Sequence, residues 1–220
     1  MPSHTLKIYD PPQEPLKIIH EDAHIIVVSK PAGLLSVPGK GEHLADCLAA
    51  RVQAAFPGAL VIHRLDMDTS GVLIMARNKD AQANIGKQFE RRKTRKVYIA
   101  DIWGAPAESS GLVDLPLRCD WDNRPRQMMC HEQGKPAQTR WEIIGQHERG
   151  ARVKLEPITG RTHQLRVHMQ ALGFPILGDC FYAHEQAQNA AKRLHLHAQS
   201  LTLHHPDGGD LITFEDAAGF

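Results

Sequence analysis

The stretch HRLDMDTSG, residues 63–71, is the most informative part of this 220-residue chain. It lies between two apolar runs, residues 60–62 and 72–75, which we interpret as buried strands with the polar stretch as the loop between them. Strands fix the position of the loop they hold, so the ionisable Arg64 and Asp66 are suitably placed for chemistry. Chemistry alone leaves two interpretations open: a reactive carboxylate, or a polar turn in which Asp66 caps backbone N–H groups.

A second polar cluster is TGRTHQLRVH, residues 159–168. If it opens a helix, Arg166 and Gln170 lie on one face, with Thr162 one turn before them. Arg166 could then reach a carboxylate from another strand and stabilise its charge. The alternative is a solvated arginine on an exposed helix face.

The rest of the chain shows patterns of short strands and a few helices. We predict a hairpin over residues 17–29, helices over 43–56, 79–92 and 162–172, and strands over 96–103, 141–144, 151–155 and within 196–214. Asn78 is the expected cap of the second helix, and residues 105–135 give no clear pattern. This mixture predicts one α+β domain over residues 17–220, after an extended arm at residues 1–16.

Composition narrows the class of protein. The chain is 42% hydrophobic and 23% charged, which is typical of soluble globular proteins. No apolar run of about eighteen residues predicts a membrane span, and the first residues have no secretory-signal pattern. Four scattered cysteines without a CxxC pair are typical of reduced intracellular thiols. We therefore expect a cytoplasmic protein with no membrane partner.

Fourteen histidines are many for this length, but their spacing does not favour a metal site. Ligands usually converge at i,i+4 on a helix or flank a turn, whereas His163 and His168 are five apart and His204 and His205 are adjacent. The phosphate-binding patterns GxGxxG and GxxxxGK[ST] are absent. We expect no metal and no cofactor.

A basic run, RRKTRK at residues 91–96, contains five positive charges in six residues. The formal net charge of +1 does not argue against nucleic acid, because the local field attracts phosphate. Arg118, Arg124 and Arg126 could add to the same face. A solvated helix end is the ordinary alternative for such a run.

The polar stretch at 63–71 resembles the signature of the RluA family of pseudouridine synthases, in which arginine-leucine-aspartate is followed by threonine-serine-glycine. Further matches follow in the family's order: IVVSKPAGL at 26–34, KVYIA at 96–100, PITGRTHQLRVH at 157–168, PILGD at 175–179 and LHLHA at 194–198. Together they run from about residue 18 to residue 215. The resemblance implies one catalytic domain on a large mixed, mostly antiparallel sheet flanked by helices. Family members often carry an extra N-terminal S4-type RNA-binding domain, and we expect none here, because there is no room for one before residue 18.

The resemblance also implies roles for individual residues. Asp66 would be the nucleophile and Arg166 its ion-pair partner. Tyr98 would stack on the target uracil and help to remove the C5 proton, while Arg64 would enter the RNA stack in place of the flipped nucleotide. Arg161 would make a supporting contact with RNA or with its own loop.

The expected RNA contacts also include His63, Arg92, Arg95 and Lys96. Asp68 departs from the family's commonest form, which has alanine there. It points away from the nucleophile if the segment is extended, and we expect it to matter little for catalysis.

The implied reaction moves uracil from an N1 to a C5 linkage without adding or losing a group, so it needs neither a redox cofactor nor ATP. Whether the carboxylate acts at C1′, at C6 or through a glycal stays open. The compact form resembles family members that modify a tRNA anticodon-stem-loop uridine and a 23S rRNA loop uridine. We expect a monomer with RNA as its partner; the alternatives are a non-catalytic RNA-binding module and a metal-dependent hydrolase.

Overall fold

Two almost fully buried strands lie at the centre of the N-terminal half. In the computed structural model, which describes residues 9–220, β2 (Ile25–Lys30) pairs antiparallel with β4 (Ser70–Ala76). Burial on both faces explains their near-continuous runs of Ile, Val and Leu. β1 (Lys17–Glu21) pairs with β2 and confirms the predicted hairpin. β3 (Leu60–Val61) is shorter and more exposed than the buried strand we predicted.

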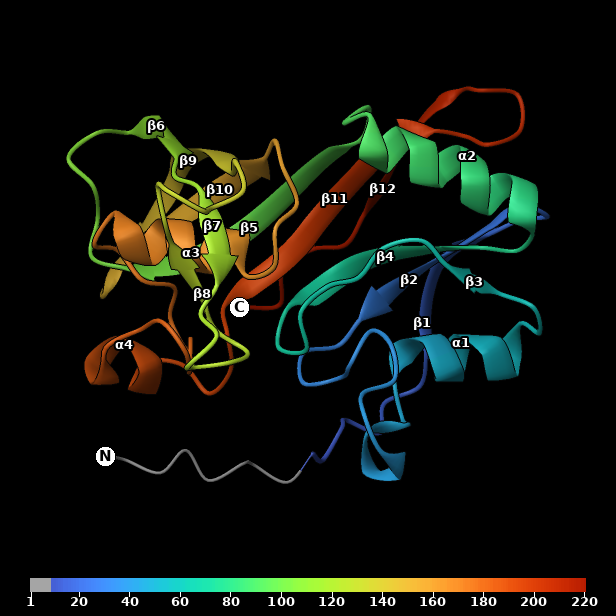
Figure 1. Cartoon of the computed structure of the whole chain (residues 1–220), viewed down its shortest axis with the longest axis horizontal. Coiled ribbons are helices and arrows are strands. Elements are labelled where there is room, and N and C mark those ends of the chain that lie inside the picture. Colours follow the sequence, from blue (N-terminus) through green and yellow to red (C-terminus); the bar gives the residue numbers. More distant parts are fainter. Residues whose placement is uncertain (1–8) are drawn as a thin grey trace.

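Ten strands within residues 9–220 form one sheet, in the order β1-β2-β4-β11-β5-β10-β9-β6, with β12 beside β11 and β3 beside β4 (Figure 1). The other strands of this sheet are β5 (Arg95–Trp103), β6 (Ser110–Asp114), β9 (Gln138–His147), β10 (Gly150–Pro157), β11 (Leu196–His204) and β12 (Leu211–Glu215). Its pairings are antiparallel apart from β4 with β11, which confirms the predicted sheet type. A small hairpin, β7 (Leu117–Cys119) and β8 (Gln127–Met129), forms in the region that gave no clear pattern.

Helices cover both faces of the sheet. The helices of residues 9–220 are α1 (Leu48–Ala55), α2 (Lys79–Glu90), α3 (Gln164–Ala171) and α4 (Glu185–Asn189), with a 3-10 turn at Glu42–Leu44. Alternate side chains of β2 pack in two separate clusters, one with α1 and one with α2, so these two helices lie on opposite faces. α3 packs in a third cluster with β5 and β10 in the C-terminal half (Figure 1).

The observed starts of α1 and α2 can be compared with the starts predicted from the sequence. Asn78 caps α2 as predicted, with its side-chain oxygen accepting from Ala81 N–H at 2.9 Å. The start predicted for the first helix, His43, is wrong, because the backbone at Cys47 is extended and α1 begins at the next residue. There the cysteine Sγ accepts from Ala50 N–H, a cap that the apolar periodicity does not reveal.

Gly71 joins the two halves of the sheet. It pairs with Ala198 in the parallel contact between β4 and β11. Its φ is +111°, and a Cβ atom would lie 2.3 Å from the Ala198 carbonyl oxygen. Glycine is therefore required for the strands to meet, and their meeting fixes the end of the 63–71 loop.

The predicted N-terminal arm lies partly outside the described residues, which begin at Tyr9. Residues 9–16 form neither helix nor strand, and the Tyr9 hydroxyl donates to the Asp46 carbonyl oxygen while accepting from Leu35 N–H. None of the helices in the described part of the chain is long and apolar enough to cross a membrane.

Candidate active site

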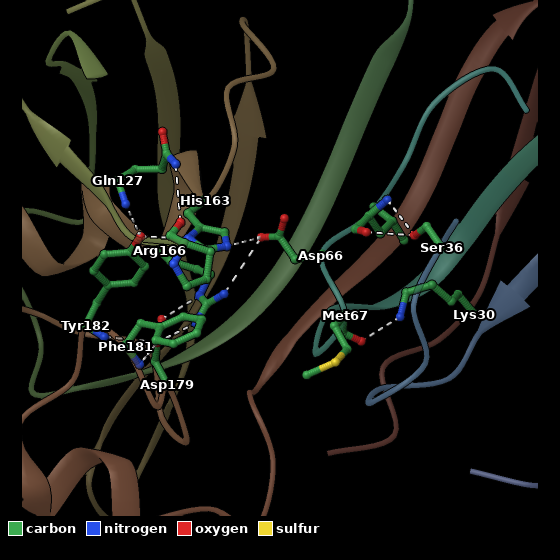
Figure 2. A network of polar contacts seen from close by, with 12 residues as sticks. Lys30, Ser36, Asp66, Met67, Gln127, His163, Arg166, Asp179, Phe181 and Tyr182 are labelled. Carbon is green, nitrogen blue, oxygen red and sulfur yellow. Dashed lines mark hydrogen bonds and ion pairs between the residues drawn. The ribbon is translucent and has the colours of Figure 1, made fainter. Parts of the chain in front are cut away.

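The backbone around Asp66 is held from both sides. Ser36 Oγ donates to the Leu65 carbonyl oxygen at 2.7 Å and accepts from Leu65 N–H at 3.0 Å (Figure 2). Lys30, which is fully buried, donates from Nζ to the Met67 carbonyl oxygen at 2.7 Å, and to two further carbonyl oxygens. These bonds position the loop before any substrate binds.

The Asp66 side chain points away from its own loop, towards the start of α3. Its Oδ2 lies 3.9 Å from Arg166 Nη1 and 3.9 Å from His163 Nε2 (Figure 2). Asp66 and Arg166 thus lie at the outer limit of an ion pair. The side chain faces these donors across the pocket.

Arg166 is held by a different carboxylate. Its Nε and Nη2 donate to both oxygens of Asp179, at 2.8 and 2.7 Å, and its guanidinium lies against the rings of Phe181 and Tyr182. Only 2% of the Arg166 side chain is exposed, so a solvated helical arginine is excluded. Asp179 fixes the guanidinium and leaves Nη1 directed at Asp66.

The start of α3 is built around Gln164. Its side-chain oxygen accepts from the Thr159 hydroxyl and from Arg161 N–H, and its amide donates to the Gln138 carbonyl oxygen. His163 precedes the helix with φ of +54°, in the left-handed region that is unusual for a residue with a Cβ. This backbone turn directs the His163 ring into the pocket.

Six of the residues predicted from the sequence line one pocket of about 120 Å³. They are Arg64, Asp66, Lys96, Tyr98, Arg161 and Arg166. Pockets for drug-sized ligands measure roughly 300–1,000 Å³, so this smaller pocket suits a single flat base rather than a dinucleotide. Residues that are far apart in the sequence therefore meet at one small site.

Tyr98 forms one wall of this pocket, on β5. It packs against the clusters of both halves of the molecule. Burial, reinforced by the nearby Asp66 carboxylate, raises the pKa of the Tyr98 hydroxyl well above its usual range. The phenol is therefore neutral near pH 7 and presents its ring to the pocket.

Three of the expected RNA contacts lie elsewhere. His63 faces inwards: its ring stacks on Phe89, and its Nε2 accepts from Ile74 N–H, so its contacts here are structural. Arg92 is exposed and lines a second pocket, which shares Lys96 and Arg161 with the first. Arg95 is exposed and pairs with Glu156.

The segment at Asp68 turns instead of running extended, so the condition under which Asp68 was expected to point away is not met. Thr69 N–H donates to the Asp66 carbonyl oxygen at 3.2 Å. Burial raises the pKa of Asp68, and the positive charges of Arg166 and Lys30 partly oppose that rise. Asp68 is thus close enough to feel these charges, although it does not line the pocket.

Sequence reasoning missed the supporting residues. Lys30, His163 and Asp179 were inside the quoted motifs but received no role in the site, and Tyr182 lay outside them. A carboxylate such as Asp179 in an apolar setting was the available signal. Within residues 9–220, no three His, Cys, Asp or Glu side chains are grouped as a metal site requires.

Comparison with known proteins identifies the family to which this chain is similar. Residues 24–171 match the model of the family described as RNA pseudouridylate synthase. The Escherichia coli (strain K12) protein named dual-specificity RNA pseudouridine synthase RluA is 54% identical over 214 residues, covering 96% of this chain and 98% of that protein. The protein of the same name from Vibrio vulnificus (strain CMCP6) is 52% identical over 204 residues, 90% of this chain and 82% of its own length.

A solved structure leads to the same family. The human RNA pseudouridylate synthase domain containing 1 superposes with a TM-score of 0.78 at 30% identity, over 94% of this chain and 86% of that one. The similarities to the Escherichia coli and human proteins cover 94–96% of the chain, and the residues matched by the family model include the loop that carries Asp66. The chain belongs to the RluA family of RNA pseudouridine synthases.

Proposed function

We propose that this protein converts uridine to pseudouridine in structured RNA, with Asp66 as the nucleophile. The observation that carries the proposal is the convergence of Asp66, Tyr98, Arg166 and Arg64 on one pocket of base-sized volume. The reaction breaks the N1–C1′ bond, turns the uracil and rejoins it through C5. A carboxylate suits the attack because it is a small anion held by a fixed loop.

The other pocket residues have complementary roles. Arg166, anchored by Asp179, supplies positive charge close to Asp66. Tyr98 offers its ring to the uracil, and its raised pKa means that it acts as a neutral phenol. Removal of the C5 proton therefore needs either a partner that accepts the proton from the phenol or another base.

Access to the base requires flipping, because a paired or stacked uracil is unreachable. Arg64 is exposed at the mouth of the pocket, where its planar guanidinium can take the place of the flipped base. Arg92, Lys96 and Arg161 line the adjoining pocket, which suits it to the phosphates on one side of the flipped nucleotide. Arg95 can add to this surface once it leaves Glu156.

The proposed substrates are a uridine in a tRNA anticodon stem-loop, a loop uridine in 23S rRNA, or both. Bacterial relatives that are 52–54% identical over nearly the whole chain are named dual-specificity enzymes, which supports two classes of RNA. We propose that the protein acts as a monomer in the cytoplasm.

The first test uses purified protein and RNA transcripts of both classes, with pseudouridine measured by chemical mapping. Wild type should form pseudouridine at defined sites. Asp66→Asn should retain RNA binding and lose at least about 10³-fold in rate, in the range seen when a catalytic group is removed. Full activity of Asp66→Asn would remove Asp66 from the mechanism. Absence of pseudouridine changes in tRNA and rRNA from a strain lacking the protein would overturn the substrate assignment.

A further inference from the structure

The hydrogen bonds around Tyr182 determine which nitrogen of His163 carries the proton. Gln127 N–H donates to the Tyr182 hydroxyl at 2.8 Å, and this hydroxyl lies 2.6 Å from His163 Nδ1 (Figure 2). A phenolic hydroxyl has one proton to give. If Gln127 N–H and His163 Nδ1–H both donated to the hydroxyl, neither group could accept the hydroxyl's own proton, which lies in a buried site. The hydroxyl therefore donates to Nδ1, and the ring proton is on Nε2.

Two further properties support this assignment. Burial raises the pKa of Tyr182 to about 12, so the hydroxyl keeps its proton. Burial also lowers the pKa of His163 below its ordinary value, although the nearby Asp66 carboxylate acts in the opposite direction. The imidazole is thus neutral near pH 7, with one N–H and one acceptor nitrogen.

The protonated nitrogen faces the proposed nucleophile. His163 Nε2 lies 3.9 Å from Asp66 Oδ2, the same oxygen that Arg166 Nη1 approaches. Such contacts are commonly long without substrate and shorten in the reacting complex. Oδ1 of Asp66 is the oxygen that these two donors do not face.

We infer that His163 is a positioning residue: Tyr182 holds it as the neutral Nε2–H tautomer, and with Arg166 it binds Oδ2 of Asp66 so that Oδ1 is presented to the substrate. This inference rests on the proposed function of Asp66. A neutral donor orients the carboxylate without adding a second full positive charge, which would stabilise the free anion and make it a poorer nucleophile. The left-handed backbone at His163 is the local strain that aims the ring.

Three variants distinguish the contribution of the His163 N–H from that of its ring and from that of the Tyr182 hydroxyl. His163→Phe keeps an aromatic ring that can stack on Phe181 but has no N–H, whereas His163→Gln keeps an N–H near the position of Nε2. Tyr182→Phe keeps the ring beside Arg166 and removes only the hydroxyl. Single-turnover rates and RNA affinities are measured for each variant with a transcript that wild type modifies.

We expect His163→Phe to lose about 10- to 100-fold in rate, as for a removed hydrogen bond to a charged group, with unchanged RNA affinity. His163→Gln should recover most of that loss, and Tyr182→Phe should lose less than His163→Phe. A wild-type rate in His163→Phe would overturn the inference. So would equal losses in His163→Phe and His163→Gln, which would indicate a purely structural ring.

A measurement without turnover keeps the test independent of folding defects and of the proposed function. Ring ¹⁵N chemical shifts of wild type should show a protonated Nε2 and an unprotonated Nδ1 for His163. Asp66→Asn should shift Nε2, and Tyr182→Phe should give a mixture of tautomers. A protonated Nδ1 in wild type overturns the inference whether or not Asp66 is catalytic. Full activity of Asp66→Asn with the expected tautomer would instead refute the proposed nucleophile, and with it the positioning role of His163, while the tautomer assignment would stand.

Discussion

The pocket around Asp66 and the basic run at residues 91–96 both depend on arginine, but they hold it in opposite ways. Arg166 in the pocket is 2% exposed and is fixed by both oxygens of Asp179. Arg95 in the basic run is 68% exposed, and Glu156 is its ion-pair partner. Breaking a buried pair removes about 3–5 kcal/mol, whereas an exposed pair contributes roughly 0–1 kcal/mol. The first arrangement suits a fixed role in chemistry, and the second suits a surface that adjusts to RNA.

The largest expected effect is on stability, from Asp179→Asn. With its oxygen in the Oδ1 position, the asparagine can still accept from the backbone N–H groups of Phe181 and Tyr182 and from Arg166 Nη2. Its amide then faces Arg166 Nε, donor against donor. The buried guanidinium loses its charge partner, so we expect a loss of about 3–5 kcal/mol in the free energy of unfolding. Urea denaturation measures this loss, with Arg95→Gln as the exposed control. Equal losses of unfolding free energy in Asp179→Asn and Arg95→Gln would contradict the contrast between the two regions.

A second effect concerns the buried cation under the loop. Burial lowers the pKa of the Lys30 ammonium from 10.5 to about 7, and the charges of Asp68 and Asp66 oppose that shift. Between these two values the unfolded chain binds a proton that the folded chain has released. The free energy of unfolding should therefore rise with pH across this window, by at most about 1.4 kcal/mol per pH unit from this group.

Two measurements check this behaviour of Lys30. The slope of the unfolding free energy between pH 7 and 9 should be smaller in Lys30→Met than in wild type. In ¹³C-lysine spectra, one Cε resonance should titrate near pH 7 and be missing in the variant. If every lysine of the folded protein titrates near pH 10, the lowered pKa of Lys30 is wrong. The three carbonyl oxygens that accept from Nζ would then stabilise the ammonium more than burial destabilises it.

A smaller effect is expected in the basic run. Arg92→Gln with Lys93→Gln should weaken RNA binding about tenfold at physiological salt and flatten the plot of log affinity against log salt by roughly 0.7–0.9 for each phosphate that is no longer neutralised. The rate in the bound complex should not change. Lys79→Gln, at the other end of α2, is the exposed control. An unchanged salt slope in the double variant would remove these side chains from the RNA surface.

Elements that depend on local contacts could be predicted from the sequence, whereas those that depend on distant contacts could not. β4 and α2 follow from local periodicity and a local cap, and both form as predicted. The β7–β8 hairpin (residues 117–129) was not predicted because contacts distant in the sequence support it, such as Gln127 N–H to the Tyr182 hydroxyl. Sequence periodicity reflects the local preferences of neighbouring residues, so it cannot predict contacts between distant segments.

The same limit applies to the site. Asp66, Tyr98 and Arg166 were predicted through the family resemblance, not through chemistry, which left a capping aspartate and a solvated arginine open. Burial of Arg166 depends on Asp179, thirteen residues later in the chain. The tautomer of His163 depends on Tyr182. Roles that arise from two or three meeting segments become visible only in the folded chain.

The smallest expected effect is at Asp68, two residues from the proposed nucleophile. Burial raises the pKa of its carboxyl. The charges of Arg166 and Lys30 favour the ionised form, whereas those of Asp179 and Asp66 oppose it. These influences partly cancel, and the side chain does not line the pocket. Asp68→Ala should therefore keep the single-turnover rate within about threefold and the unfolding free energy within about 1 kcal/mol, the usual range for a change outside core and site. A rate loss above tenfold, with RNA affinity retained, would place Asp68 in the catalytic machinery together with Asp66.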